Sequence, residues 1–150
     1  MENKLLKLSS LNDAKNELLK LSKSKNVAAP QWSAYKILVH CTQTIEYSMK
    51  GYPKLKPKFI RMTVGKIAIK KFLNQGYMKH SLTAPVPSAP EIKNAGDEVA
   101  AMKNLLSAID KFIAFNSELQ PHLLFGTLTK DEYNKYFAMH IADHLSELTY

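Results

Sequence analysis

The sequence predicts an all-α protein built as a four-helix bundle. Three observations support this class: apolar residues recur at helical spacing in four long segments, the alternation typical of β-strands is nearly absent, and proline, glycine or serine separates the segments. A helix with one apolar stripe is stable when it buries that stripe against other helices. Since 150 residues suffice for one hydrophobic core, we expect residues 1–150 to form a single domain.

The first helix is expected over residues 11–22. Ser9 or Ser10 precedes it and can accept hydrogen bonds from the free N–H groups of its first turn. Its apolar residues lie three or four positions apart, which places them on one face: Leu11, Ala14, Leu18 and Leu21. This helix therefore needs a partner for that face.

The second helix is expected over residues 33–50, between Pro30 and Gly51. Its apolar stripe has the spacing of a bundle helix and consists of Ala34, Leu38, Cys41, Ile45 and Met49. His40 lies on the flank of this stripe beside Ile37. Cys41 is the only cysteine, so an internal disulfide is excluded, and its place in the stripe favours a packing role.

A basic amphipathic helix, inserted between the second and third bundle helices, is expected over residues 59–74, ending near Gly76. Basic residues crowd this region: Lys54, Lys56, Lys58, Arg61, Lys66, Lys70 and Lys71. The apolar residues among them are expected to dock the helix onto the bundle, namely Phe59, Ile60, Ile67 and Phe72. Residues 81–90 contain three prolines, which favours an extended linker.

The third bundle helix has the clearest periodicity, carried by Val99, Met102, Leu105, Leu106, Ile109, Phe112 and Ile113. The last helix begins at a capping box, in which the side chains of Thr129 and Glu132 each accept a hydrogen bond from the backbone N–H of the other residue. Its apolar stripe continues through Tyr133, Phe137, His140, His144 and Leu148. Both of these histidines therefore lie within an apolar face.

Lysine and arginine outnumber aspartate and glutamate by 21 to 13, a formal net charge of +8 that favours anionic partners. Contact of residues 54–71 with nucleic acid or a membrane surface ranks lowest among the uses of this charge, because charge runs are usually solvated faces. No segment is long and apolar enough for a membrane span, and the first ten residues lack the apolar core of a signal peptide. We therefore expect a cytoplasmic protein.

His140 and His144 are four residues apart, so their imidazoles project from successive turns of one face and can bind one metal ion. The alternative is a pair of core or rim histidines, each hydrogen-bonded to a carbonyl or a carboxylate, and the spacing alone does not decide between them. Burial favours the metal, because four ring nitrogens would otherwise need partners, at about 1–3 kcal/mol for each one unmet. His40, on a second helix, is the natural third ligand.

Three protein ligands leave a coordination position open, as in catalytic zinc sites. Water or a substrate thiol could occupy that position, and a divalent ion would lower the pKa of either. The sequence offers no clear general base. Asp143 is expected to point away from the apolar stripe and Glu147 to lie at its edge, as solvated surface acids or as partners that orient a ring.

Several short motifs occur in a distinctive order along the chain. They are Trp32-Ser33 at the start of a helix, Leu38-Val39-His40 within it, Gly51-Tyr52-Pro53 after it, Pro121-His122, Phe125-Gly126-Thr127-Leu128-Thr129, and His140-Ile141-Ala142-Asp143-His144-Leu145. Over about residues 11–148 the sequence resembles the DinB/YfiT-like superfamily, and within it an uncharacterised subfamily.

The resemblance implies a bundle with an up-down-down-up course, often dimeric, in which three histidines bind a divalent ion, zinc or nickel. Carried over by position, these ligands are His40, His140 and His144. It further implies either transfer that depends on a low-molecular-weight thiol or hydrolysis, although other members have no known activity. The partners to expect are a small-molecule substrate, such as an anionic thiol, and a second copy of the chain.

The chain departs from the subfamily pattern at Asp143, where many relatives have a further histidine, and at Leu123, where they have a proline. His122 is interpreted as a capping or surface histidine rather than a site residue, and His80 as a solvated loop residue. The sequence thus favours a metal-dependent transferase or hydrolase. It leaves open a bundle that binds a metal or a partner without catalysis.

Overall fold

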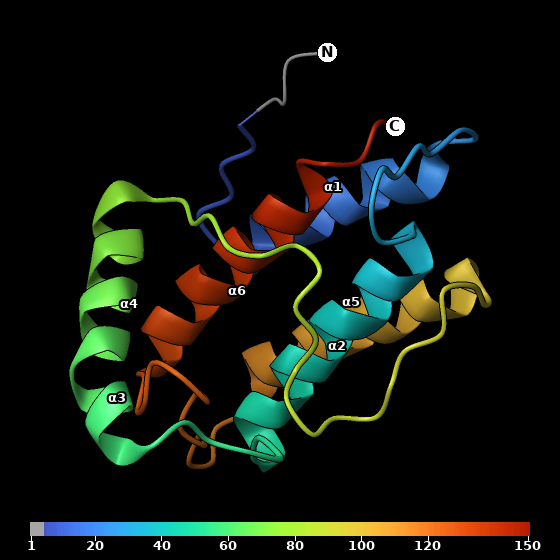
Figure 1. Ribbon diagram of the computed structural model, residues 1–150. Helices are drawn as coiled ribbons and strands as arrows, with labels where there is room; N and C mark the ends of the chain where they lie inside the picture. Colours follow the sequence, from blue (N-terminus) through green and yellow to red (C-terminus); the bar gives the residue numbers. More distant parts are fainter. Residues whose placement is uncertain (1–4) are drawn as a thin grey trace.

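The computed structural model describes residues 5–150, which fold into helices joined by loops (Figure 1). The helices are α1 (Leu11–Lys23), α2 (Ala34–Lys50), α3 (Lys58–Met62), α4 (Val64–Gln75), α5 (Glu98–Ala114) and α6 (Lys130–Leu145). Within residues 5–150, β-structure is limited to two isolated antiparallel β-bridges, Ala28 with Thr149 and His122 with Gly126. The all-helical class predicted from the sequence is confirmed.

Four of the helices pack against one another as a bundle. Helix α2 lies along α5, α1 contacts both α5 and α6, and α2 also contacts α6. Helices α3 and α4 stand beside this group, and α4 packs on α6 (Figure 1). Helix α6 therefore has neighbours on several sides, which explains why every residue of its last eight positions, Ala138–Leu145, is buried.

Side-chain caps define where the bundle helices begin. The Ser10, Ser33 and Asp97 side chains each accept a hydrogen bond from a backbone N–H in the first turn of α1, α2 and α5. Helix α6 begins at the complete capping box of Thr129 and Glu132. The caps of α1, α2 and α6 lie within a residue or two of the helix starts that the sequence predicts.

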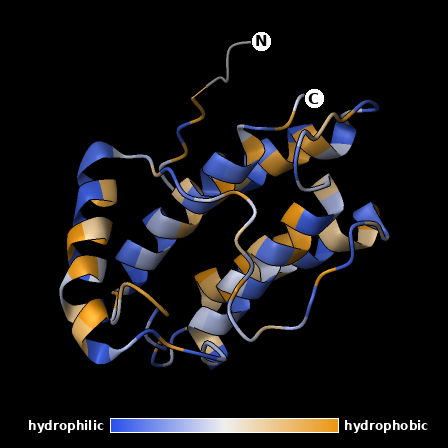
Figure 2. Cartoon of the chain, viewed as in Figure 1, coloured by the Kyte–Doolittle hydropathy of each residue, from blue (hydrophilic) through white to orange (hydrophobic). Residues whose placement is uncertain are grey.

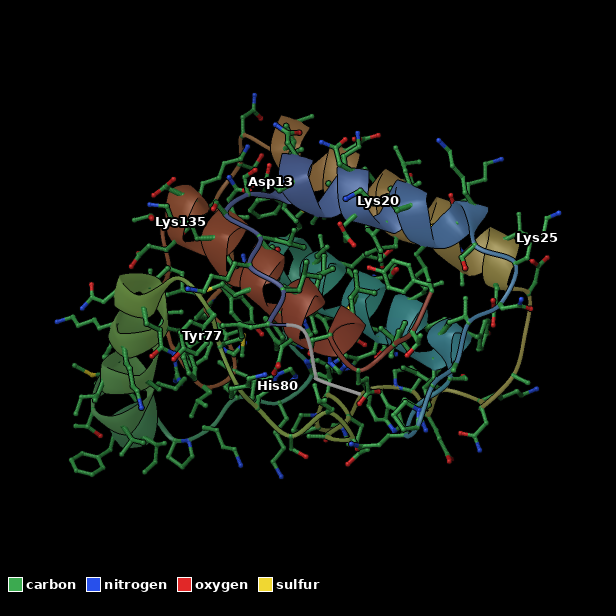
Figure 3. All side chains as sticks on the ribbon, turned by 90° about the horizontal axis from the view of Figure 1, so that it is seen from above. Asp13, Lys20, Lys25, Tyr77, His80 and Lys135 are labelled. Atoms are coloured by element: carbon green, nitrogen blue, oxygen red, sulfur yellow. The ribbon has the colours of Figure 1, made fainter. Side chains whose placement is uncertain are left out.

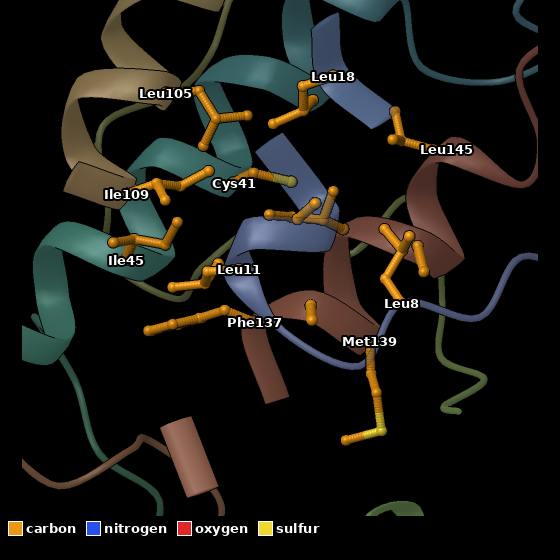
Figure 4. Close-up of a cluster of buried hydrophobic side chains, with 14 of the residues drawn as sticks. Leu8, Leu11, Leu18, Cys41, Ile45, Leu105, Ile109, Phe137, Met139 and Leu145 are labelled. Atoms are coloured by element: carbon orange, nitrogen blue, oxygen red, sulfur yellow. The ribbon is translucent and has the colours of Figure 1, made fainter. Parts of the chain in front are cut away.

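The core is a continuous cluster of apolar side chains between the bundle helices (Figure 4). Leu11 and Leu18 of α1, Ile45 of α2, Leu105 and Ile109 of α5 and Phe137 of α6 are all fully enclosed. Cys41 is 1% exposed among them, and burial raises the pKa of its thiol to about 12. The packing role predicted for this cysteine therefore fits its surroundings.

The predicted basic helix is divided in two, because α3 ends at Met62 and α4 begins at Val64. The expectation that Phe59 and Ile67 dock it onto the bundle is wrong, since they are 73% and 70% exposed. Ile69 is buried instead, and a residue two positions away on a helix lies on nearly the opposite side. Figure 2 shows hydrophobic and hydrophilic residues side by side along α3 and α4.

The two ends of the predicted stripe on α5 also differ from expectation. Val99 is 81% exposed and Ile113 is 44% exposed. At about 100° per residue both lie at or beyond the edge of the buried face of α5 rather than at its centre, whereas Phe112, next to Ile113, is only 1% exposed. The buried face of α5 consists of Ala101, Met102, Leu105, Ala108, Ile109 and Phe112.

The segment between α4 and α5 is irregular, as its prolines predict, and it crosses α6 and α2 (Figure 1). It is tied to α2 by hydrogen bonds from the Ser33 hydroxyl to the Asn94 carbonyl and from the Gln43 amide to the Pro90 carbonyl. Val86 and Ile92 anchor it by burial. The segment therefore covers the side of the bundle on which α2 and α6 meet.

No helix in the described part of the chain has the length and hydropathy to cross a membrane. The expectation that the chain begins without a signal peptide rests in part on residues 1–4. These lie outside the described residues.

Candidate metal centre

The structure brings the three predicted histidines together where α2 and α6 meet. His40 comes from the middle of α2, and His140 and His144 come from successive turns near the end of α6. Their exposed fractions are 3%, 4% and 0%. One ring nitrogen from each lies within 4.8 Å of the corresponding atoms of the other two, so the three could hold a metal ion.

The spacing of the rings suits a small divalent cation. The Nε2 atoms of His40 and His140 are 3.3 Å apart. Two nitrogens bound to one tetrahedral zinc at about 2.0–2.1 Å would be separated by about 3.3–3.4 Å. Two neutral rings at this distance can share one N–H proton in a hydrogen bond, or their two Nε2 lone pairs can bind one cation.

Burial keeps the imidazoles in the neutral form that binds metals. Desolvation lowers the pKa of His40 to about 4, and the nearby His80 adds to the shift. Desolvation likewise lowers the pKa of His144 to about 2 and that of His140 well below its usual value, with the neighbouring histidines contributing. At neutral pH the three rings therefore present lone pairs rather than positive charges.

Trp32 shields one side of the cluster from solvent. Its ring meets His40 edge-on at a centroid distance of 5.2 Å and stacks on His144 at 5.9 Å. Within residues 5–150, the Nδ1 atoms of His40, His140 and His144 are buried without a hydrogen-bond partner. The three rings are thus held by packing, and none of their Nδ1 atoms has a competing protein contact in the described range.

The prediction that His80 is a solvated loop residue is wrong. Its side chain is 21% exposed, and its Nε2 lies 3.2 Å from Nε2 of His144. Figure 3 labels His80 beneath α6, whereas Lys25 and Lys135 lie at the periphery. No spacing in the sequence signals this position, because the contact depends on how the segment after α4 crosses α6.

Asp143 is buried rather than solvated, which corrects one of the two roles predicted for it. Its carboxylate oxygen Oδ2 lies 2.6 Å from Nδ1 of His80, and its side chain is 3% exposed. The other predicted role, as the partner of a ring, agrees with this contact. Apolar patterning indicates which residues of α6 face the other bundle helices, but it does not indicate that the segment after α4 covers the side that carries Asp143.

Glu147 is also more enclosed than a surface acid, at 9% exposure. Among the described residues, neither of its buried carboxylate oxygens has a hydrogen-bond partner. Desolvation raises its pKa, the nearby Asp143 raises it further, and His80 opposes the shift. Two acidic groups therefore lie close to the histidine cluster, one of them bonded to a ring.

His122 is a buried structural residue and stands apart from the cluster. Its Nδ1 accepts hydrogen bonds from the backbone N–H groups of Leu124 and Phe125, each at 3.1 Å, and its Nε2 lies 3.1 Å from the Tyr136 hydroxyl. Desolvation lowers its pKa to about 3. The capping role predicted for it fits this geometry, whereas a surface position does not, since it is 4% exposed.

His122→Ala is expected to destabilise the fold by about 2–4 kcal/mol, because it leaves two backbone N–H groups without an acceptor. Chemical denaturation checks this value. His122→Asn, which keeps an acceptor near the same backbone, is expected to recover part of the loss. Equal stability of the alanine variant and the unaltered protein would contradict this role.

Comparison with known proteins adds a family but no activity. Neither the curated proteins nor the solved structures contain a match. A family model described as "Protein of unknown function (DUF1569)" matches residues 1–150. The chain, with three buried histidines that could hold a metal ion, belongs to the DUF1569 family.

Proposed function

We propose that this protein is a metal-dependent transferase or hydrolase of the DinB/YfiT-like superfamily, with His40, His140 and His144 as ligands of one divalent ion, zinc or nickel. In this proposal α1, α2, α5 and α6 follow the up-down-down-up course of that superfamily. Helices α3 and α4 are then a basic insertion, and residues 1–150 act as one domain.

The observation that carries the proposal is the enclosure of three neutral imidazoles whose ring nitrogens lie within 4.8 Å of one another. Two polar rings in adjacent turns of a buried helix face are costly unless their nitrogens are satisfied. The three ligands come from two helices of the core, α2 and α6, and are held in place by packing, as in other bundle metal sites. The all-nitrogen donor set suits zinc and nickel rather than magnesium or calcium.

A bound divalent ion would supply Lewis acidity and would favour the deprotonated form of a water or a thiol. The protein's own residues position the ion. The packed core holds the rings of His40, His140 and His144 in place, so these side chains need not rearrange when an ion binds. Trp32 limits the access of bulk water to His40 and His144.

A surface pocket beside Trp32 supports a small anionic substrate. It lies between α2 and the proline-rich segment, and Trp32, Lys36 and Gln43 line its α2 side. The Lys36 ammonium group lies 4.9 Å from the centroid of the Trp32 ring. A carboxylate bound by Lys36 would thus lie next to the residue that covers the histidines, and a low-molecular-weight thiol with an acidic group has that chemistry.

Elemental analysis after loading with zinc or nickel tests the ligand set. We expect about one ion per chain in the unaltered protein and a large loss in His140→Ala, because the site loses one of the imidazoles that the bundle core holds in place. His122→Asn is the matched control, since it alters a buried histidine outside the cluster. An unaltered protein that takes up no ion, while its circular dichroism shows it folded, would overturn the proposal.

A second candidate is a bundle that binds the ion or a protein partner without catalysis. The burial of all three rings favours it, because a substrate reaches an enclosed ion only when the covering residues move. Screening the loaded protein against thiol-dependent, ester and amide substrates separates the two functions. In both cases we propose a cytoplasmic protein that forms a homodimer and does not bind nucleic acid.

A further inference from the structure

His80 is fixed at the edge of the three-histidine cluster by one carboxylate oxygen. Its backbone N–H lies 3.0 Å from Oδ2 of Asp143, and its ring Nδ1 lies 2.6 Å from the same oxygen. The other oxygen of Asp143 lies 3.6 Å from the Lys79 ammonium group. Because backbone and ring of His80 share one buried anchor on α6, the direction of the ring is determined.

The hydrogen bonds also determine which nitrogen of His80 is available. A carboxylate has no proton to donate, so Nδ1 of His80 is the donor in its bond to Asp143. In a neutral imidazole the remaining nitrogen then carries a free lone pair. Metal-binding histidines typically have this arrangement, with one nitrogen on a carboxylate and the other on the ion.

That free nitrogen points into the cluster. Nε2 of His80 lies 3.2 Å from Nε2 of His144, matching the 3.3 Å between His40 and His140. The His80 ring centroid lies 4.8 Å from those of both His140 and His144, which are themselves 4.8 Å apart. Two nitrogens bound to one tetrahedral zinc would be separated by about 3.3–3.4 Å, and each of these Nε2 pairs fits that spacing. His80 is not among the three histidines whose ring nitrogens all lie within 4.8 Å of one another, so its ring would have to shift further into the cluster to complete a set of four.

We propose that His80 is a fourth nitrogen ligand of the ion bound by the three-histidine cluster, and that Asp143 is the positioning residue that directs it. This inference rests on the proposed function only for the presence of an ion at that cluster. His80 is the one ligand of the four that is not carried by a helix. A thiol or water that binds the ion would therefore compete with the one ligand that lies on an irregular segment.

Loading the protein with Co²⁺ tests the proposal, because the visible absorption of this ion reports its coordination geometry, and X-ray absorption counts the imidazoles around it. We expect four imidazoles in the unaltered protein. His80→Ala and His80→Gln are expected to show three, with Co²⁺ affinity lowered at least about 10-fold.

Asp143→Asn is expected to keep four imidazoles but to bind Co²⁺ about 10- to 100-fold more weakly, the usual effect of removing a partner that orients a ligand. Ser81→Ala, an exposed neighbour of His80 in the same segment, is the matched control and should bind as the unaltered protein does.

The outcomes are distinguishable. Three imidazoles in the unaltered protein, with an unchanged spectrum and affinity in His80→Gln, would overturn the fourth ligand and leave the three-histidine site standing. In that case the contact between His80 and His144 is a hydrogen bond. Failure of the unaltered, folded protein to bind Co²⁺, Zn²⁺ or Ni²⁺ would overturn both the fourth ligand and the proposed function.

Discussion

Acidification of the metal-free protein from pH 7 to pH 4 is expected to remove several kcal/mol of stability and to unfold it. His40, His122, His140 and His144 all have lowered pKa values in the folded state, because burial disfavours their charged form. Unfolded histidines bind protons near pH 6.5. The unfolded state is therefore favoured as the pH falls.

The sign and the pH window follow from these shifts. Stability is fully present above pH 6.5 and is lost as the pH falls towards the folded-state values, which are about 4 for His40 and about 3 for His122. By pH 4 each of these two residues accounts for about 3 kcal/mol. Glu147 acts in the opposite sense, because its raised pKa favours the folded state on acidification. Since domains are typically stable by about 5–15 kcal/mol, the histidines suffice to unfold the protein.

Urea denaturation at several pH values, with a chelator present, measures this effect. His40→Gln is the informative variant, because it removes one titrating group: between pH 7 and pH 4 it should lose about 3 kcal/mol less than the unaltered protein. Saturating Zn²⁺ should move the loss to lower pH, since the ion binds only the neutral rings. A denaturation midpoint that stays constant from pH 7 to pH 5 would show that the buried histidines do not control acid stability.

Replacing Gly65 with alanine is expected to destabilise the protein by about 3 kcal/mol or more, although alanine is normally the better residue in a helix. Gly65 is buried in the first turn of α4. A Cβ atom at this position would overlap the backbone carbonyl oxygen of Leu124 and lie 2.9 Å from the Leu124 carbonyl carbon. Backbone atoms cannot rotate aside, so α4 would have to move away from the loop that precedes α6.

Gly76→Ala is the matched control for this prediction. Gly76 ends α4 with a φ of 77°, and a Cβ there would meet no atom within 4 Å. Its replacement is therefore expected to cost only the strain of the left-handed conformation, about 1–2 kcal/mol. Chemical denaturation compares the two variants. If Gly65→Ala is no less stable than Gly76→Ala, close backbone packing does not set the position of α4.

Displacement of α4 in Gly65→Ala would also reach the histidine cluster. The segment that carries His80 begins directly after α4, and His80 meets α6 through Asp143. Ion affinity should therefore fall in this variant but not in Gly76→Ala. This links the packing of the basic insertion to the site.

The sequence by itself determined the helices and most of the core, because local signals specify both. Apolar spacing locates α1, α2, α5 and α6, and the Thr129 and Glu132 capping box marks the start of the last of them. The apolar spacing of the last helix also placed His140 and His144 on one buried face, since residues four apart on a helix share a face. The approach of His40 could be expected because two apolar stripes must pack together.

Only the tertiary structure decided the surroundings of these histidines. The contact of His80 with Asp143 joins residues 63 positions apart through an irregular segment that has no periodicity to interpret. The exposure of Phe59 and Ile67 depends on which sides of α3 and α4 face the bundle, and the chain is broken at Thr63 between these two helices. Local sequence specifies which face of a helix is apolar, but the path of a loop is set by the surfaces it crosses, and those surfaces exist only after the bundle has formed.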